Sequence, residues 1–227
     1  MRTRPTNPNP RHAAVHTLYL AVTGGGKSQA VNANLREQLK ANGQYRVVMW
    51  DQAGDYPGHH YETRQGFITA LHSALKTGRG FRIAFAGTPT LKNWEWWCEM
   101  VWGILDGNRI TYAIAEELSA VSPSAGKATD NAAIILNQGR KFGLRFHGVS
   151  QKPQEVAKTY FDQCPIKWIG QQKSRAMIRR SAEDMGTDEA TIRNLKALEF
   201  LVDDGTATPP ERTRIKPRTI TGIHWHT

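Results

Sequence analysis

The run LYLAVTGGGKS, residues 18–28, constrains the fold of this chain more than any other segment. It places an apolar stretch, three consecutive glycines and a Lys-Ser pair in immediate succession, and a helical pattern follows. A buried strand, a glycine turn and a helix start in this order are typical of a P-loop, in which backbone N–H groups surround phosphate oxygens. The sequence therefore predicts an α/β fold with a nucleotide site at this turn.

The residue types of the loop assign roles within that site. Lys27 is expected to reach the β- and γ-phosphates of ATP, and the Ser28 hydroxyl to bind Mg²⁺ at the helix N-terminus. One departure is Ala21, which stands where the full P-loop pattern has glycine. The alternative is a glycine turn followed by an incidental Lys-Ser pair. The predicted nucleotide-binding residues are Thr23, Gly24, Gly25, Gly26, Lys27, Ser28 and Gln29.

Length and composition favour a single globular unit. The chain has 227 residues, and its 39% hydrophobic content is enough for a substantial core. Cys98 and Cys164 lack metal-ligand spacing and are expected to be packing residues in a reducing compartment. No run approaches the roughly 18 apolar residues that a membrane span requires, so we expect no transmembrane segment.

Short β-rich runs alternate with helical stretches, as expected for a parallel sheet with crossover helices. We expect a basic, proline-rich N-terminal arm over 1–14, a P-loop domain over 15–205 and a basic C-terminal arm over 206–227. Strands are predicted over residues 16–22, 45–51, 81–86, 110–115, 144–150 and 166–170, with 199–202 and 213–216 as edge strands. Helices are predicted over residues 27–41, 66–77, 94–105, 128–142, 153–162 and 174–185.

An apolar strand that ends in two acids supplies what a hydrolytic P-loop needs. The run ITYAIAEE places Glu116 and Glu117 directly after the predicted strand 110–115. In such pairs the first acid supports Mg²⁺ and the second polarises the attacking water. Glu116 stands where Asp is usual, so its contact with Mg²⁺ is expected to be water-mediated or to require a deeper strand. A surface acid pair at the start of a loop is the alternative.

The strand 144–150 is followed by Gln151-Lys152-Pro153, a polar amide placed where a γ-phosphate can be sensed. Here the chain resembles the FtsK/HerA group of DNA-pumping ATPases, in which a strand ends in Thr/Ser-Gln-Arg/Lys-Pro. Residues 139–143, GRKFG, are similar to the Gly-Arg-x-x-Gly segment of that group. Residues 51–56, DQAGDY, are similar to its Asp-x-x-Gly-Glu-Tyr turn. The resemblance covers residues 15–205 and is greatest to the packaging ATPases of membrane-containing double-stranded DNA phages of the tectivirus type.

The resemblance implies a P-loop NTPase fold of the RecA and FtsK/HerA kind, with a mostly parallel central sheet flanked by helices. It implies an ATP- and Mg²⁺-dependent enzyme that forms a homo-hexameric ring, translocates double-stranded DNA and packages a viral genome into a preformed procapsid. Its location would be the virion vertex and the host cytoplasm, with capsid-vertex or membrane-anchored viral proteins as further partners. Catalysis would use Glu117, Gln151 and an arginine from the neighbouring subunit. Arg175 and Arg140 are candidates for this arginine, and Lys167 is a competing cation for the same role.

The charge distribution agrees with a polyanionic partner. Residues 131–180 contain ten Lys and Arg residues against only Glu155 and Asp162, within a chain whose formal net charge is +10. Such a local excess suits sequence-independent contact with a phosphate backbone. A solvated basic face without a partner is the alternative.

Tryptophans and histidines form two further groups. Trp94, Trp97, Val101 and Leu105 recur at helical spacing and are expected in the core, whereas Trp96 and Met100 lie off that stripe and are candidates for a docking patch. The histidines are expected in a loop (His59, His60) and in the tail (His224, His226), where their spacing alone is insufficient for a metal site.

Four other functions remain open at this stage. A conjugative or plasmid-transfer ATPase would share the same motifs. A filamentous-phage assembly ATPase would carry a membrane segment. A small-molecule kinase would need an arginine-bearing lid but no pair of Glu117 and Gln151. A nucleotide-binding structural protein of the virion would not turn over.

Overall fold

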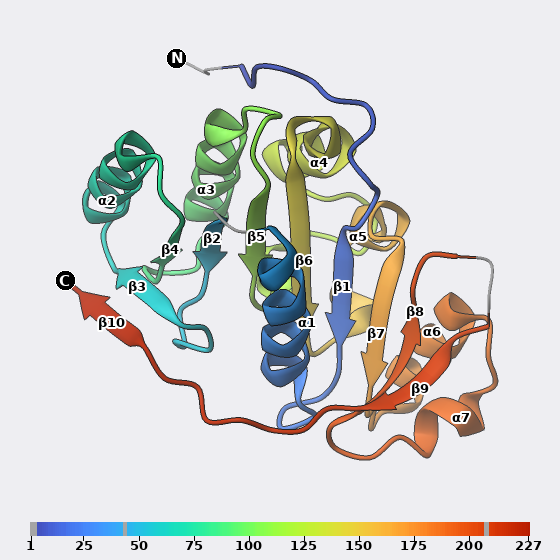
Figure 1. Ribbon diagram of the computed structural model, residues 1–227. Helices are drawn as coiled ribbons and strands as arrows, with labels where there is room; N and C mark the ends of the chain where they lie inside the picture. Colours follow the sequence, from blue (N-terminus) through green and yellow to red (C-terminus); the bar gives the residue numbers. More distant parts are fainter. Residues whose placement is uncertain (1–3, 43–44, 207–208) are drawn as a thin grey trace.

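One mixed sheet of ten strands runs through the middle of the molecule (Figure 1). The computed structural model describes residues 4–42, 45–206 and 209–227. The strand order is β10-β3-β4-β2-β5-β6-β1-β7-β8-β9, and every neighbouring pair is parallel except β7 with β8 and β8 with β9. The expected α/β fold with a mostly parallel sheet is therefore confirmed.

The strands are β1 (Thr17–Leu20), β2 (Arg46–Trp50), β3 (Gly58–Tyr61), β4 (Phe81–Phe85), β5 (Thr111–Ala115), β6 (Leu144–Ser150), β7 (Ile166–Gly170), β8 (Glu199–Asp203), β9 (Glu211–Arg214) and β10 (Ile223–His226). The α-helices are α1 (Lys27–Asn42), α2 (Arg64–Thr77), α3 (Leu91–Ile104), α4 (Asp130–Gln138), α5 (Lys158–Gln163), α6 (Arg175–Met185) and α7 (Glu189–Arg193). Short 3₁₀ helices lie over Leu118–Val121, Gly139–Phe142 and Pro153–Glu155. No helix of the described ranges is long and apolar enough to cross a bilayer.

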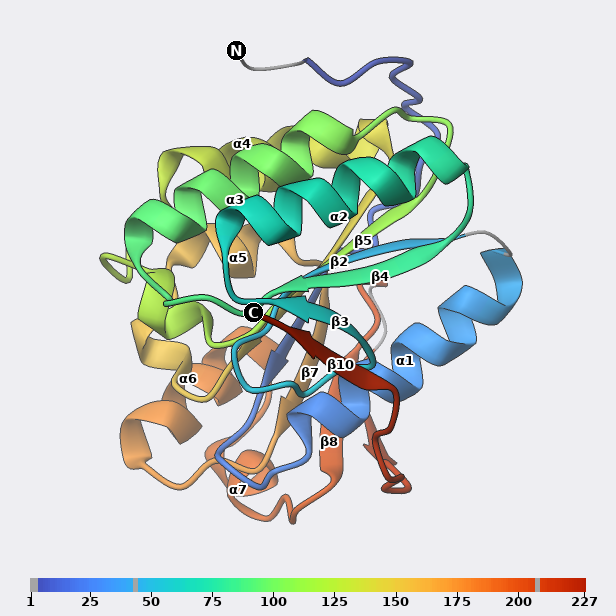
Figure 2. The same cartoon turned by 90° about the vertical axis from the view of Figure 1, so that its left-hand side faces the viewer.

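The two faces of the sheet carry separate hydrophobic cores, because alternate residues of a strand point to opposite sides. Leu18 and Leu20 of β1 belong to the larger core, beneath helices α2 to α7. Tyr19 and Ala21 belong to the smaller core, which α1 covers. Figure 2 shows α1 on one side of the sheet and the layer formed by α2, α3, α4 and α5 on the other.

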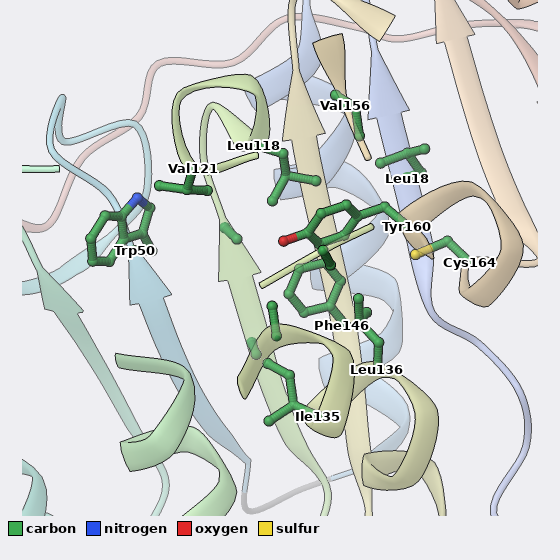
Figure 3. Packing of buried hydrophobic residues seen from close by; sticks show 14 of the residues in the cluster. Leu18, Trp50, Leu118, Val121, Ile135, Leu136, Phe146, Val156, Tyr160 and Cys164 are labelled. Atoms are coloured by element: carbon green, nitrogen blue, oxygen red, sulfur yellow. The ribbon is translucent and has the colours of Figure 1, made fainter. Parts of the chain in front are cut away.

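The larger core is dense in aromatic rings. Trp50 makes an edge contact with Trp94 at 5.3 Å between ring centroids, and Trp94 stacks on Trp97 at 5.2 Å. The stripe of Trp94, Trp97, Val101 and Leu105 is buried as the sequence predicts. Figure 3 shows the neighbouring part of this core, where side chains of α4, α5, β1 and β6 meet those of the 3₁₀ helix Leu118–Val121.

Trp96 and Met100, which lie off the predicted stripe, also take part in the packing of α3. Both side chains are partly buried and pack against the larger core. Trp96 makes edge contacts with Phe67 and Phe85 at 5.6 and 5.1 Å, and the Arg64 guanidinium covers its ring at 4.8 Å. The apolar surface of α3 is wider than one helical stripe because α2 covers its second side.

Several element boundaries differ from the prediction. The helix expected over 128–142 is divided into α4 and a 3₁₀ turn at Gly139, where a Cβ atom would lie 2.5 Å from the Leu144 side chain. Only the second part of the helix expected over 153–162 is an α-helix, since it begins at Lys158. The short helix α7 was not predicted.

The C-terminal residues form more of the sheet than the sequence indicates. Residues 206–227, expected as an arm with an edge strand over 213–216, contribute β9, which overlaps that strand, and β10, which was not predicted. The loop expected around His59 and His60 is strand β3. β3 and β10 are short and rich in histidine, so they lack the apolar alternation that identifies a half-buried strand. Residues 1–3 and 207–208 of the two predicted arms lie outside the described residues.

Two histidines are buried in the sheet as neutral rings. Phe146 N–H donates to His16 Nδ1 at 3.1 Å, and the Tyr19 hydroxyl lies 3.2 Å from His147 Nδ1. Burial lowers the pKa of His16 to about 4, and burial with the nearby positive charges of His16 and Arg145 lowers the pKa of His147 to about 3. Both pKa values lie below the ordinary value of 6.5, so only the unfolded chain takes up these protons between pH 6.5 and 4.

Unfolding is therefore expected to become easier as the pH falls below about 6.5, by up to about 1.4 kcal/mol per pH unit for each of the two rings. The measurement is urea denaturation between pH 7.5 and 5. His147→Asn, whatever its effect at pH 7.5, should flatten this pH dependence, while replacement of the exposed His72 by Gln should leave it unchanged. An equal slope in His147→Asn and the unmodified protein would contradict the assignment.

Candidate nucleotide and hydrolysis site

The predicted site residues meet at the carboxyl edge of the parallel strands. β1, which carries the glycine loop, lies between β6 and β7, and β6 separates it from the acid-bearing β5. Leu20 pairs with Ser150 and Ile169, while Ala115 pairs with Gly148. Residues that follow these strands therefore share one edge, where ligands of open α/β sheets bind.

The glycine loop has a backbone that few other residues can adopt. Gly24 and Gly26 have φ values of +73° and +98°, in the left-handed region that favours glycine. A Cβ atom on Gly25 would lie 2.9 Å from the Ala21 methyl group. Ala21 thus replaces the usual glycine because the missing side chain at position 25 leaves room for its methyl group.

Lys27 begins α1 and is 8% exposed. Its Nζ donates to Val22 O at 3.2 Å, so the side chain folds back over the loop. Burial lowers the pKa of Lys27, while the nearby Glu116, Glu117 and Asp55 oppose that shift. A buried ammonium group beside an open loop of N–H donors is suited to phosphate oxygens.

Glu116 follows β5 and accepts a short hydrogen bond from the Tyr56 hydroxyl. Burial, together with the negative charges of Asp55 and Asp51, raises the pKa of Glu116 to about 8 against the opposing effects of Tyr56 and Lys27. Burial and Asp51 likewise raise the pKa of Asp55, whose carboxylate accepts a hydrogen bond from Ser28. Crowded carboxyl groups of this kind are stabilised by a cation.

The donor set fits Mg²⁺, which prefers oxygen ligands and usually combines one or two carboxylates with phosphate oxygens and water. Ser28, Asp55 and Glu116 supply such oxygens next to Lys27. Within the described residues no cluster of three His, Cys, Asp or Glu side chains is arranged to hold a metal ion. The ion would therefore depend on nucleotide and water oxygens as well as on these three residues.

Glu117 is held by several donors in a strained conformation. Its φ of +50° lies in the left-handed region, which non-glycine residues rarely occupy and in which residues of functional sites are enriched. Glu117 Oε1 accepts from the Ser119 hydroxyl at 2.5 Å, from the Ser150 hydroxyl at 3.1 Å and from Gln151 N at 3.4 Å. These contacts aim one carboxylate oxygen at β6 and fix the acid close to the P-loop.

Gln151 connects that acid to the glycine loop. The Thr23 hydroxyl donates to Gln151 Oε1 at 2.6 Å, while the backbone N–H of Gln151 points at Glu117. Lys27, Glu117 and Gln151, which are predicted from three separate segments, thus lie together. A ligand phosphate in the loop would lie beside both the acid and the amide.

The turn after β2 contributes to the site in a way that its sequence did not predict. Asp51 is fully buried, and its carboxylate accepts from the backbone N–H groups of Gly54 (2.9 Å), Asp55 (3.1 Å) and Tyr56 (3.2 Å). It also lies 2.9 Å from His60 Nε2. The similarity of residues 51–56 to the Asp-x-x-Gly-Glu-Tyr turn marked this segment in the sequence, but not the contacts of its side chains with Ser28 and Glu116.

The arginine candidates lie in different places. Arg175 begins α6 after β7, at the same edge as the P-loop, and its side chain is exposed. Arg140 precedes β6 at the opposite edge, where its guanidinium donates to the carbonyl oxygens of Pro10 and His12 and fastens the N-terminal segment. Lys167 is largely buried in an ion pair with Asp184 at 3.3 Å.

A C-terminal strap, residues 215–222, passes along this edge from β9 to β10 (Figure 1). The Gln29 amide donates to Arg218 O and accepts from Arg218 N, both at 2.9 Å. Gln29, predicted to bind nucleotide, therefore has its side-chain amide paired with the strap. The strap ends at β10, whose Trp225 lies over His60 at 4.9 Å between ring centroids.

A known phage protein is similar to this chain in sequence. The chain is 32% identical to protein P9 of Pseudoalteromonas phage PM2 over 218 residues, covering 93% of this chain and 94% of that protein. No family model matches.

The fold is similar to three solved structures of low sequence identity. The genome packaging NTPase B204 of Sulfolobus turreted icosahedral virus 2, in complex with ATPγS, has a TM-score of 0.66 at 14% identity, with 91% of this chain and 98% of that chain covered. The bacterial conjugative coupling protein TrwB has a TM-score of 0.64 at 13% identity, covering 98% and 90%. VirB4 of Thermoanaerobacter pseudethanolicus has a TM-score of 0.64 at 10% identity, covering 96% of each chain.

Proposed function

Because the chain belongs to the family of protein P9 of Pseudoalteromonas phage PM2, in the FtsK/HerA superfamily of P-loop ATPases, we propose that it is an ATP-driven translocase that packages double-stranded DNA into a preformed viral procapsid. The observation that carries this proposal is the fixed Glu117 beside Gln151 and the P-loop. An acid held next to the phosphate loop favours water as the nucleophile, whereas a kinase must admit another acceptor.

The residues of the site divide the work of hydrolysis between them. The N–H groups of the loop and Lys27 would bind the phosphates, and Ser28, Asp55 and Glu116 would hold Mg²⁺, which when bound would neutralise charge on the phosphate oxygens. Glu117 orients the attacking water and accepts its proton. Gln151 accepts a hydrogen bond from Thr23 of the glycine loop. A γ-phosphate bound in the loop would break this contact or keep it, and Gln151 would transmit that difference to β6.

A ring of identical subunits completes the site. We place the nucleotide between neighbouring subunits of a homo-hexamer, with Arg175 reaching the γ-phosphate bound by the adjacent copy. Its exposure at the P-loop edge supports this choice over Arg140, which is engaged by the N-terminal segment, and over the buried Lys167. A trans-acting arginine would make hydrolysis depend on assembly.

Double-stranded DNA is the proposed substrate for translocation. Structural partners occupy several cations of the basic region 131–180, including Arg140 and Lys167. Other exposed cations of this region would contact the DNA backbone; they are Lys141, Lys158 and Lys173. The protein would act at the packaging vertex of the virion and in the host cytoplasm, with capsid-vertex or membrane-anchored viral proteins as partners.

The test is ATP hydrolysis by the purified protein with and without linear double-stranded DNA across a salt series. Hydrolysis is expected to rise with DNA of any sequence. The apparent DNA affinity should fall linearly on a log–log plot against salt, with a slope near −0.9 for each phosphate contacted. Hydrolysis indifferent to DNA, or DNA binding insensitive to salt, would contradict the proposal.

Conjugative DNA transfer is the second candidate. TrwB and VirB4 each have a TM-score of 0.64 to this chain, close to the value of 0.66 for B204. Both candidates predict DNA-stimulated hydrolysis, so location separates them. Detection of the protein in purified virions, and DNA-filled particles only when it is functional, would favour packaging.

A further inference from the structure

We infer that Trp225 and the C-terminal strap position the Mg²⁺ side of the nucleotide site, so that β10 acts as a support for Asp55 and Glu116. This inference rests on the proposed function, since it concerns the same site. It assigns a role to residues that are remote in sequence from the P-loop and both acids. Trp225 is a positioning residue here, because it does not reach the nucleotide loop itself.

The strap is first fixed at the start of α1. Gln29 directly follows the Mg²⁺ ligand Ser28, and its amide makes two hydrogen bonds of 2.9 Å with the backbone of Arg218. Because one side-chain amide binds both the N–H and the C=O of Arg218, it fixes the position and the direction of the strap at this residue. The chain is therefore guided along the site before it reaches β10.

β10 then covers the turn after β2. It pairs in parallel with β3, with Trp225 opposite His60 and His224 opposite His59. The Trp225 ring lies against Gly54, where an added Cβ atom would be only 2.8 Å from Trp225 Cζ2. Gly54 has a φ of +73°, so both its conformation and the close ring require glycine at this turn.

The contact continues through His60 into the turn. His60 lies between the Trp225 ring at 4.9 Å and Asp51 Oδ2 at 2.9 Å, and it is fully buried. Asp51 binds three successive backbone N–H groups of the turn. Trp225 therefore contacts the turn directly at Gly54 and contacts its anchoring carboxylate indirectly, through His60.

The turn delivers two side chains to the site. Asp55 accepts from Ser28, and Tyr56 donates to Glu116. If Trp225 is removed, the turn loses its cover and these contacts loosen, although Lys27 and the glycine loop are untouched. The expected defect is therefore in Mg²⁺ affinity and not in the capture of phosphates.

The experiment compares three variants of the full chain. Trp225→Ala removes the ring, Trp225→Phe keeps an aromatic face, and His224→Ala is the matched control. His224 is adjacent on the same strand but points to the opposite face, where it stacks on His59 at 5.0 Å and lines a cavity of about 780 Å³ between α2 and β3.

Two readouts are measured. Backbone hydrogen exchange without nucleotide should accelerate at residues 52–56 in Trp225→Ala, while β5 and β6 stay protected. The Mg²⁺ concentration for half-maximal ATP hydrolysis should rise about three- to tenfold, somewhat less than the usual loss for an outer-shell residue of a metal site, with kcat at saturating Mg²⁺ nearly unchanged. Trp225→Phe should restore most of the protection at residues 52–56 and most of the Mg²⁺ affinity. His224→Ala should match the unmodified protein in both readouts.

The inference is overturned if exchange at 52–56 and the Mg²⁺ dependence are unchanged in Trp225→Ala. It is also overturned if exchange rises throughout the sheet, since Trp225 would then serve global stability alone. If the unmodified protein does not hydrolyse ATP, the proposed function fails, and the exchange readout together with Mg²⁺-dependent binding of a fluorescent ATP analogue still decides the inference.

Discussion

Glu117→Gln is expected to lower kcat for ATP hydrolysis by about 10²- to 10⁴-fold, the usual contribution of a general base, while nucleotide affinity stays near that of the unmodified protein. The amide keeps the size of the side chain but cannot accept the proton of the attacking water. The Thr23–Gln151 contact and Lys27 are not altered. Steady-state hydrolysis with DNA gives kcat, and titration with a fluorescent ATP analogue gives the affinity.

Glu155→Gln is the matched control, because Glu155 is an exposed acid that follows the neighbouring strand β6 and pairs with Lys152. It should hydrolyse ATP like the unmodified protein. A Glu117→Gln protein with more than about a tenth of the original kcat would exclude Glu117 as the base. Loss of nucleotide binding would instead indicate that the amide disturbs the P-loop.

Arg175→Ala is expected to lower hydrolysis by about 10³- to 10⁵-fold, the range for a trans-acting arginine, without loss of nucleotide binding. The reason is geometric. Arg175 is exposed after β7, so a neighbouring subunit can receive it. Arg179→Ala is the control, since Arg179 lies one turn further along α6 and pairs with Glu183 at the surface.

Mixing two inactive proteins tests whether the arginine acts in trans. In rings formed from equal amounts of Arg175→Ala and Glu117→Gln subunits, about a quarter of the interfaces combine an intact Glu117 with an intact Arg175 from the neighbour. Hydrolysis should therefore recover in the mixture. No recovery from co-assembled rings would mean that Arg175 acts within its own subunit or on DNA.

The parts of the fold that follow a strong local pattern could be predicted from sequence. β1, β2, β5 and β6 are apolar runs bounded by polar residues, and helix α3 carries an apolar stripe. The glycine loop and the two acids were predictable for the same reason, since each follows a buried strand. In a parallel sheet the ends of such strands share one edge.

The rest depended on tertiary contacts that leave little trace in a local window. Strands β3 and β10 are four residues long and histidine-rich, and each is defined only by its pairing with a distant segment. The positions of Asp55 and Tyr56 follow from the order of β2 and β5 within the sheet, which the sequence does not state. Trp96 appeared exposed on a helical projection because the position of α2 was unknown.

The conformation of Glu117 has a consequence for how this site is maintained. A left-handed glutamate costs about 1–3 kcal/mol, and glycine would adopt the same φ of +50° without that cost. Backbone conformation alone would therefore favour glycine at this position, whereas the hydrogen bonds from Ser119, Ser150 and Gln151 favour the acid. The glutamate is thus kept in its left-handed conformation by its neighbours, and substitutions at Ser119 or Ser150 would release the acid without touching it.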